Sequence, residues 1–153
     1  MINPAIALLR VNHELALEFL ATFSRLEYAL KVTGHLQSNE GEAKADWKKF
    51  VSKIEYIFKP KNLDDFNFLF EYKLEMLGHV GNSIDWIEFN TSKTKNNLDC
   101  VILKIKQIRN NLFHGGKYAP AENSEDEKLL KASINILLEI KSALPDVNSA
   151  YDY

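Results

Sequence analysis

Glycine and proline are scarce in this chain of 153 residues, and their positions predict where helices begin and end. The chain contains six glycines and four prolines, and both residue types are unfavourable inside helices. Pro4 suits the first turn of a helix, Pro60 and Pro145 stop helices, and Gly115 with Gly116 ends another. Between these breaks, apolar residues recur three and four positions apart, which is the period of an amphipathic helix. The pattern predicts a helical protein.

The predicted fold is all-α, an antiparallel four- to five-helix bundle. It forms one domain over residues 1–145, followed by a loose C-terminal tail over residues 146–153. The aromatic run in the third segment would also suit a strand, and a helix is expected there. The expected helices cover residues 4–34, 47–58, 64–78, 98–112 and 124–144.

The composition is that of an ordinary globular protein, with 46% hydrophobic and 26% charged residues. Cys100 is the single cysteine, so an internal disulfide cannot form and a reducing compartment is expected. A buried apolar position is the ordinary role for such a residue. No apolar run reaches the ~20 residues that cross a bilayer, and the first residues do not read as a signal peptide. The expected location is cytoplasmic, with no membrane contact.

Positive charge is concentrated in one segment of the chain. Six bases and one acid, Asp99, lie between Lys93 and Lys117, a local charge of +5 in a chain whose net charge is −2. A basic segment in an acidic protein suggests that one face binds an anionic partner. The alternative is a solvated lysine face without a ligand.

Within this segment, Arg109, Asn110 and His114 stand at the end of the fourth expected helix. At about 100° per residue, Asn110 and His114 lie about 160° from the centre of the apolar stripe, whereas Arg109 lies about 60° from it. Arginine is rare here, with three among 19 basic residues. Its planar guanidinium binds phosphate oxygens in a bidentate way that lysine cannot match. A structural arginine at the edge of a helix remains the alternative for Arg109.

This Arg-Asn-x-x-x-His sequence, near the end of the fourth helix of a small helical protein, resembles the Arg-x4–6-His signature of the HEPN superfamily (higher eukaryotes and prokaryotes nucleotide-binding domains). The stretch "FLATFSRLEYALK", which carries Glu27, is similar to the first helix of that family. Many members are metal-independent endoribonucleases of toxin–antitoxin or defence systems, and others keep the fold without cleaving RNA. One toxin subfamily has a tyrosine two residues after the histidine, where this chain has Gly116, so control by that subfamily's antitoxin is not implied.

The resemblance implies a composite site at which the motif helices of two protomers meet, and therefore a homodimer. RNA cleavage through the 2′-hydroxyl needs a base that titrates near neutral pH and a cation for the phosphate. His114 is expected to transfer protons, Arg109 to neutralise charge in the transition state, and Asn110 to orient the imidazole or a phosphate oxygen. The partner would be RNA, with an antitoxin or regulatory protein as a further possible partner.

Supporting roles fall on residues around the motif. Lys104, Lys106 and Lys117 are expected to attract the RNA backbone without sequence preference. Glu27 is expected to hold Arg109 across the bundle, or else to pair with Lys31 four residues later.

Other chemistry has little support in the sequence. The cysteine and histidine spacing predicts no metal site, there is no phosphate-binding glycine-rich motif, and no cofactor is expected. Three hypotheses remain: a dimeric endoribonuclease, a non-catalytic relative that binds nucleotides, RNA or a protein, and a helical scaffold without a ligand.

Overall fold

The chain forms a mostly helical structure with one small β-hairpin. The computed structural model describes residues 1, 3–7, 9, 11–113 and 124–153. These ranges hold seven helices and one two-stranded antiparallel sheet. The elements are α1 (Pro4–Ala7), α2 (His13–Val32), α3 (Trp47–Ile54), α4 (Leu63–Glu71), β1 (Glu75–Val80), β2 (Ser83–Glu88), α5 (Asn97–Phe113), α6 (Ser124–Lys141) and α7 (Pro145–Asp152). None of the described helices is long and apolar enough to cross a membrane.

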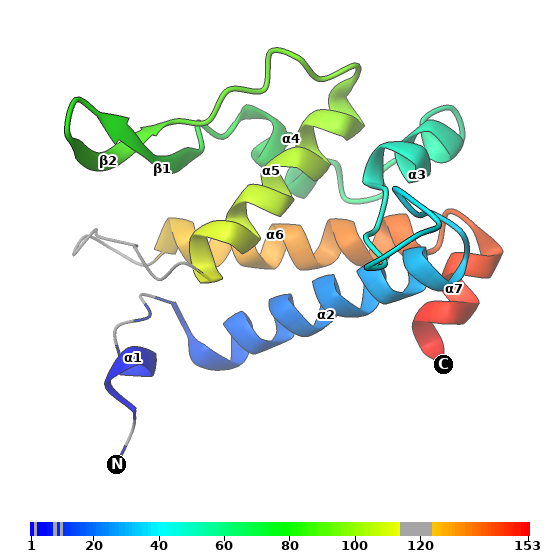
Figure 1. Cartoon of the computed structure of the whole chain (residues 1–153), viewed down its shortest axis with the longest axis horizontal. Coiled ribbons are helices and arrows are strands. Elements are labelled where there is room, and N and C mark those ends of the chain that lie inside the picture. The colour runs from blue at the N-terminus through cyan, green and yellow to red at the C-terminus, as the bar shows by residue number, and fades with distance from the viewer. Residues whose placement is uncertain (2, 8, 10, 114–123) are drawn as a thin grey trace.

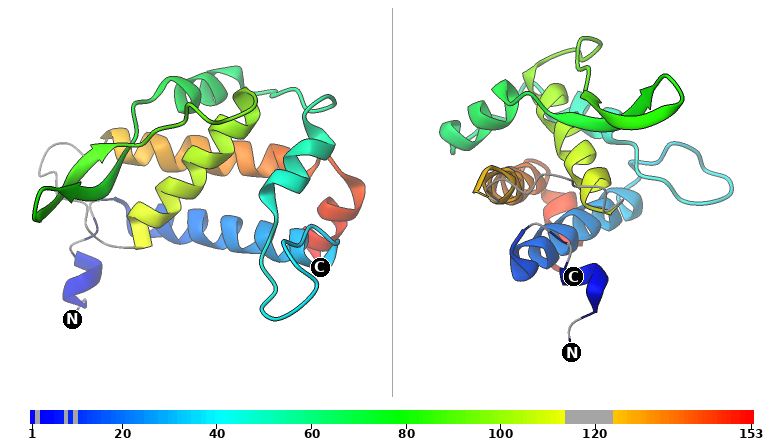
Figure 2. Two further views of the ribbon diagram at one scale, coloured as in Figure 1. Left: turned by 45° about the horizontal axis from the view of Figure 1, so that its top comes forward. Right: turned by 90° about the vertical axis from the view of Figure 1, so that its left-hand side faces the viewer.

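Helices α2 and α6 form the base of the structure. They lie side by side and run in the same direction (Figure 1). The backbone N–H of Asn12 donates to Glu127 Oε1 at 3.2 Å, which links the starts of the two helices. Helix α5 crosses this pair, and α4 and the hairpin lie on the same side as α5 (Figure 2). The largest fully buried apolar side chains are Phe19, Leu26, Leu30, Phe50, Ile54, Leu69, Val101, Ile105, Ile136, Leu137 and Ile140.

The helical class is confirmed, but the simple antiparallel bundle is wrong. Two of the longest helices are parallel, because α5 returns the chain across both of them before α6 begins. The expected 30-residue first helix is two helices, α1 and α2. Asn12 separates them: its side-chain oxygen accepts a hydrogen bond from Leu15 N at 3.0 Å and caps the start of α2. The helices expected near residues 47, 98 and 124 are confirmed.

The third expected helix is half helix and half hairpin. The aromatic run Phe66–Phe70 is helical as predicted, but α4 ends at Glu71, and β1 and β2 follow. Val80 pairs with Ser83, which leaves a two-residue turn of Gly81 and Asn82. Gly81 has φ +61°, a value that the first central residue of a type II′ hairpin turn requires. Gly78 was expected to end a helix, but it lies within β1, opposite Asp85, and the turn comes at the next glycine.

The C-terminal tail was expected to be loose, and this prediction is wrong. Residues Pro145–Asp152 form α7, which begins with proline at its first turn and buries Val147 completely. The Arg25 side chain donates to the carbonyls of Tyr151 and Ala150, at 2.7 and 3.2 Å. These carbonyls lie in the last turn of α7, where intrahelical donors are missing. The short helix is therefore fastened at both its apolar face and its C-terminal end.

A buried histidine follows the end of α2. Gly34, with φ +86°, lets His35 N bond back to Leu30 O at 2.9 Å, which closes the helix and turns the chain inward. The imidazole of His35 is fully buried, meets Phe50 edge-on and bonds Thr33 Oγ1 through Nδ1 at 3.0 Å. Its Nε2 is buried, and no partner for it lies among the described residues.

Burial lowers the pKa of His35, and the positive charge of Lys53 and Lys49 lowers it further, while Asp146 opposes them. The unfolded chain therefore binds a proton near the reference pKa of ~6.5, whereas the folded chain resists protonation. We expect the free energy of unfolding to fall as the pH is lowered from about 7 to about 5. In His35→Asn, whose amide replaces Nδ1, this loss should be smaller. Denaturant unfolding at several pH values measures it, and parallel curves for the two proteins would contradict it.

Candidate functional site

The predicted motif lies at the C-terminal end of α5. Arg109 and Asn110 are both partly exposed there, and Phe113, the last residue of the helix, is 62% exposed. His114 and Lys117 lie outside the described residues. The structure thus describes the arginine and the asparagine of the motif together with their surroundings.

The guanidinium of Arg109 is packed on aromatic rings. Its Cζ lies 4.9 Å from the ring centroid of Phe23, on α2, and 5.9 Å from that of Phe113. Both distances are within the range of cation–π contacts. Nε is buried, and in the part of the chain that the structure describes it has no hydrogen-bond acceptor. Within the same ranges, no carboxylate lies within 4.0 Å of this side chain. Arg109 is therefore held by stacking, and its charge has no paired carboxylate among the described residues.

Arg25 provides an internal comparison. Its side chain donates two hydrogen bonds to carbonyls at the end of α7, and its guanidinium lies 4.9 Å from the ring centroid of Tyr28. Arg25 therefore has an evident structural role that uses its hydrogen-bonding capacity. Arg109 stacks in the same way but has no such acceptor among the described residues, which suits a cation that is still able to bind an anion.

Glu27 was expected to hold Arg109, or else to pair with Lys31. Its Oε1 instead accepts a hydrogen bond from the indole Nε1 of Trp47 at 3.1 Å. Neither of the two expected ion pairs is present among the described residues. Trp47 is 5% exposed, and its ring lies 5.4 Å from that of Phe23. Glu27 therefore supports the site indirectly, by fixing the start of α3 beside the ring on which Arg109 stacks.

Lys104 was expected to attract the RNA backbone from the surface, and this prediction is wrong because the side chain is buried. The residue is 6% exposed, and its ammonium donates to the carbonyls of Phe70 and of Tyr72, the latter at 2.8 Å. These carbonyls lie at the C-terminal end of α4, where a cation satisfies groups that the helix leaves without donors. Burial lowers the pKa of Lys104. The side chain joins α5 to α4 and is not available to bind RNA.

Lys106 remains at the surface in a half-buried position. Burial has the largest effect on the pKa of Lys106 and lowers it. The carboxylate of Glu27 raises this pKa, the positive charges of Arg109 and Lys48 lower it, and Asp99 raises it. Arg109 lies three residues further along α5, beside Lys106 on the helix surface, and α3, which carries Lys48, packs against α5. Lys48 is exposed at the second position of α3. We call Lys48, Lys106 and Arg109 the three-cation cluster.

Two neighbours of the motif were missed by sequence reasoning. Asn111 donates through Nδ2 to Glu75 O at 2.8 Å and accepts from Gln107 at 2.7 Å, so it anchors the hairpin to α5. Trp47 joins α3 to α2 through Glu27. The only signal for Trp47 was an aromatic residue at the start of an amphipathic segment, which most often denotes core packing. No pattern along the sequence distinguishes Asn111 from Asn110 beside it.

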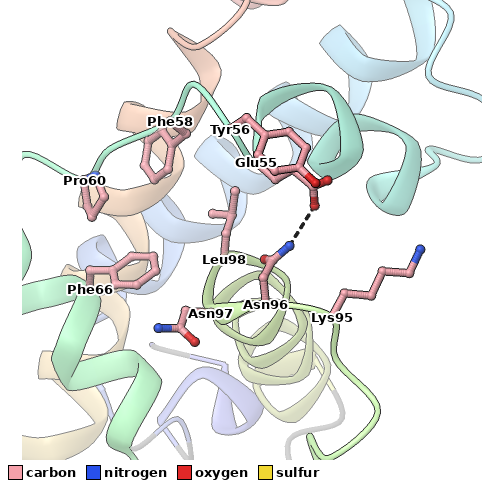
Figure 3. Close-up of a pocket in the computed structure, with 9 residues that line it drawn as sticks. All are labelled: Glu55, Tyr56, Phe58, Pro60, Phe66, Lys95, Asn96, Asn97 and Leu98. Atoms are coloured by element: carbon pink, nitrogen blue, oxygen red, sulfur yellow. Dashed lines mark hydrogen bonds between the residues drawn. The ribbon is translucent and has the colours of Figure 1, made fainter.

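A hollow of about 610 Å³ lies at the opposite end of α5 (Figure 3). Asn96 lies on one of its walls, where it donates to Glu55 Oε2 at 2.8 Å and accepts from Asp99 N at 2.9 Å. The second bond caps the start of α5. Because this polar side chain is already committed to the fold and lies far along α5 from Arg109, the hollow is not the candidate site. Among the described residues, no group of three His, Cys, Asp or Glu side chains could hold a metal ion.

Comparison of the chain with protein-family models, with curated proteins and with solved structures finds no match.

The inward position of Lys104 leads to a stability prediction. Lys104→Met keeps the aliphatic stem and removes the buried ammonium that the carbonyls of Phe70 and Tyr72 share. We expect the free energy of unfolding to fall by about 1–3 kcal/mol, the usual cost of removing a partner from a buried polar group. Lys131→Met, at an exposed position on α6, is the matched control and should change stability little. Denaturant unfolding tests both variants, and equal effects would contradict the buried role.

Proposed function

We propose that the protein is a metal-independent endoribonuclease of the HEPN type, acting in a defence or toxin–antitoxin system. The observation that carries this proposal is the state of Arg109, a stacked guanidinium with no described carboxylate or acceptor, at the helix end that leads directly to His114. An arginine without a described ion-pair partner, followed five positions later by a histidine, supplies the cation and the base that metal-free cleavage of a phosphodiester requires.

In the proposed reaction, the imidazole of His114 takes the proton from a ribose 2′-hydroxyl. The O2′–P bond then forms, the P–O5′ bond breaks, and the departing 5′ oxygen takes up a proton. The products are a 2′,3′-cyclic phosphate and a 5′-hydroxyl, so the reaction consumes no water and no redox equivalent. Arg109 neutralises the charge that grows on the non-bridging oxygens, and Asn110 orients the imidazole or one of those oxygens.

The exposed end of α5 supports a dimeric site. Phe113 exposes most of its ring at the last position of the helix, and Asn110 is partly exposed one turn earlier. In a symmetric dimer, the same apolar patch meets its own copy across the two-fold axis. Such an interface would bring two copies of the motif together and form the composite site.

A non-catalytic binding module is the second candidate. Its support is the burial of Arg109 Nε against Phe23, which is compatible with a guanidinium whose role is packing. In that case the three-cation cluster would bind RNA or a nucleotide and leave it intact. RNA binding by the wild type without any cleavage would favour this candidate.

The cleavage prediction concerns His114 and Arg109. Purified protein should cut RNA in excess EDTA, leave a 2′,3′-cyclic end, and spare DNA, which lacks the 2′-hydroxyl. His114→Ala should reduce turnover by about 10²–10⁴-fold and keep RNA binding, because it removes a proton carrier. Arg109→Ala should weaken both binding and turnover, because ground state and transition state share its charge.

His79→Ala is the control for the first variant, since His79 lies on the exposed hairpin and outside the proposed machinery. Gel analysis of end-labelled RNA gives the rates, and mass spectrometry identifies the cyclic end. Cleavage that needs Mg²⁺, or that survives unchanged in His114→Ala, would overturn the mechanism.

The dimer prediction concerns Phe113. At tens of micromolar, about the concentration that populates a weak dimer, light scattering should give the mass of two chains. Phe113→Glu should yield a folded monomer, because it places like charges opposite each other across the two-fold axis. Leu63→Glu, at another exposed apolar residue on α4, should stay dimeric. A wild-type monomer, or equal dissociation by both variants, would contradict this interface.

A further inference from the structure

Helix α3 carries three lysines between two acidic capping residues, Asp46 and Glu55. Its eight residues include Lys48, Lys49 and Lys53 and no carboxylate. The ammonium of Lys49 donates to Gly34 O at 2.9 Å and so is used within the fold. Lys48 is exposed and no described carboxylate lies within ion-pairing distance of it. This helix lies outside the basic segment that the sequence analysis identified, and nothing in the charge pattern along the chain joins the two.

The aromatic contacts below the surface explain why α3 and α5 bring their cations together. The ring of Phe23 lies 5.4 Å from that of Trp47 and 4.9 Å from Arg109 Cζ. One ring of α2 is thus shared by the first residue of α3 and by the end of α5. The bond from Trp47 to Glu27 fixes that junction. Lys48 directly follows Trp47, so its position relative to Lys106 and Arg109 is set by buried groups.

The two acids that act on Lys106, Glu27 and Asp99, each accept a hydrogen bond within the fold. Glu27 accepts from Trp47, and Asp99 accepts from the backbone N–H of Lys95 at 3.1 Å. Burial lowers the pKa of Lys106 and Glu27 raises it, while the like charges of Arg109 and Lys48 lower it further. Holding three cations together costs free energy, which an anion that contacts all of them would offset. A chain of phosphates suits such a row of cations better than a single ion does.

We propose that α3 extends the RNA-binding surface of the proposed nuclease, with Lys48 contacting a phosphate of the strand that passes from Arg109 across Lys106. The inference rests on the proposed function, because it takes single-stranded RNA as the ligand. It assigns to α3 a binding role outside the predicted motif. It also gives the bound strand a path over the surface, between the end of α5 and the start of α3.

The test measures RNA binding separately from cleavage. In a His114→Ala background, fluorescence anisotropy gives the affinity for a labelled single strand of about 12 nucleotides, a length that one binding domain can cover. Lys48→Ala should weaken binding several-fold and reduce the slope of log K against log salt by about 0.7, the value for one phosphate contact on a single strand. Lys106→Ala should act in the same direction. Lys131→Ala on α6 is the matched control and should match the parent.

The length of the RNA provides a second readout. A dinucleotide that occupies only the cleavage site should bind the parent and Lys48→Ala equally, because it does not reach α3. Circular dichroism confirms that each variant is folded. If the parent binds the long RNA and Lys48→Ala behaves like Lys131→Ala, the role of α3 is wrong while the proposed function stands. If the parent binds no RNA even at low salt, both fail. Tighter binding of an acidic peptide of equal charge would also overturn the choice of RNA.

Discussion

Helix α5 is packed on several sides at once, against α3, α4, α6 and β1, and the rest of the structure is arranged around this constraint. A helix with one buried stripe would leave Lys104 in solvent. Here the contact with α4 buries a second face of α5. On this face the ammonium of Lys104 donates to two carbonyls at the end of α4, which have no donor within that helix. The same packing buries Cys100 and Ile102, which lie outside the central stripe. The bases of α5 that remain partly exposed, Lys106 and Arg109, therefore lie in its C-terminal half.

The two described arginines differ in a way that matters for the proposed site. Both stack on aromatic rings, but Arg25 spends its donors on the end of α7, whereas no described acceptor meets Arg109 Nε. Stacking holds a guanidinium flat without neutralising it, since a ring attracts the cation only weakly compared with a carboxylate. The proposed function uses this difference, because a phosphate needs a cation that is fixed in place and still charged.

The basic residues that lie together on the surface of this protein are not simply those that are close together in the sequence. The segment from Lys93 to Lys117 looks like one basic stripe, yet Lys104 points inward and Lys106 is grouped with Lys48, some sixty positions earlier in the chain. Glu27 shows the same effect, since its partner is the indole of Trp47 and neither of the cations expected from the sequence. Pairing between side chains on different helices depends on how the helices cross, and local periodicity carries no information about crossing.

The sequence by itself determined the helical class, the position of α5, the apolar stripe within it, and the placement of Arg109 and Asn110 at its exposed end. These features are local: they follow from helix period, from proline and glycine breaks, and from capping groups that act within a few residues. Only the tertiary structure decided that α2 and α6 are parallel, that a hairpin follows α4, and that the tail is a docked helix. It also decided which lysines are buried. Each of these depends on burial against distant segments, whose favourable free energy outweighs the weak local preferences of the residues concerned.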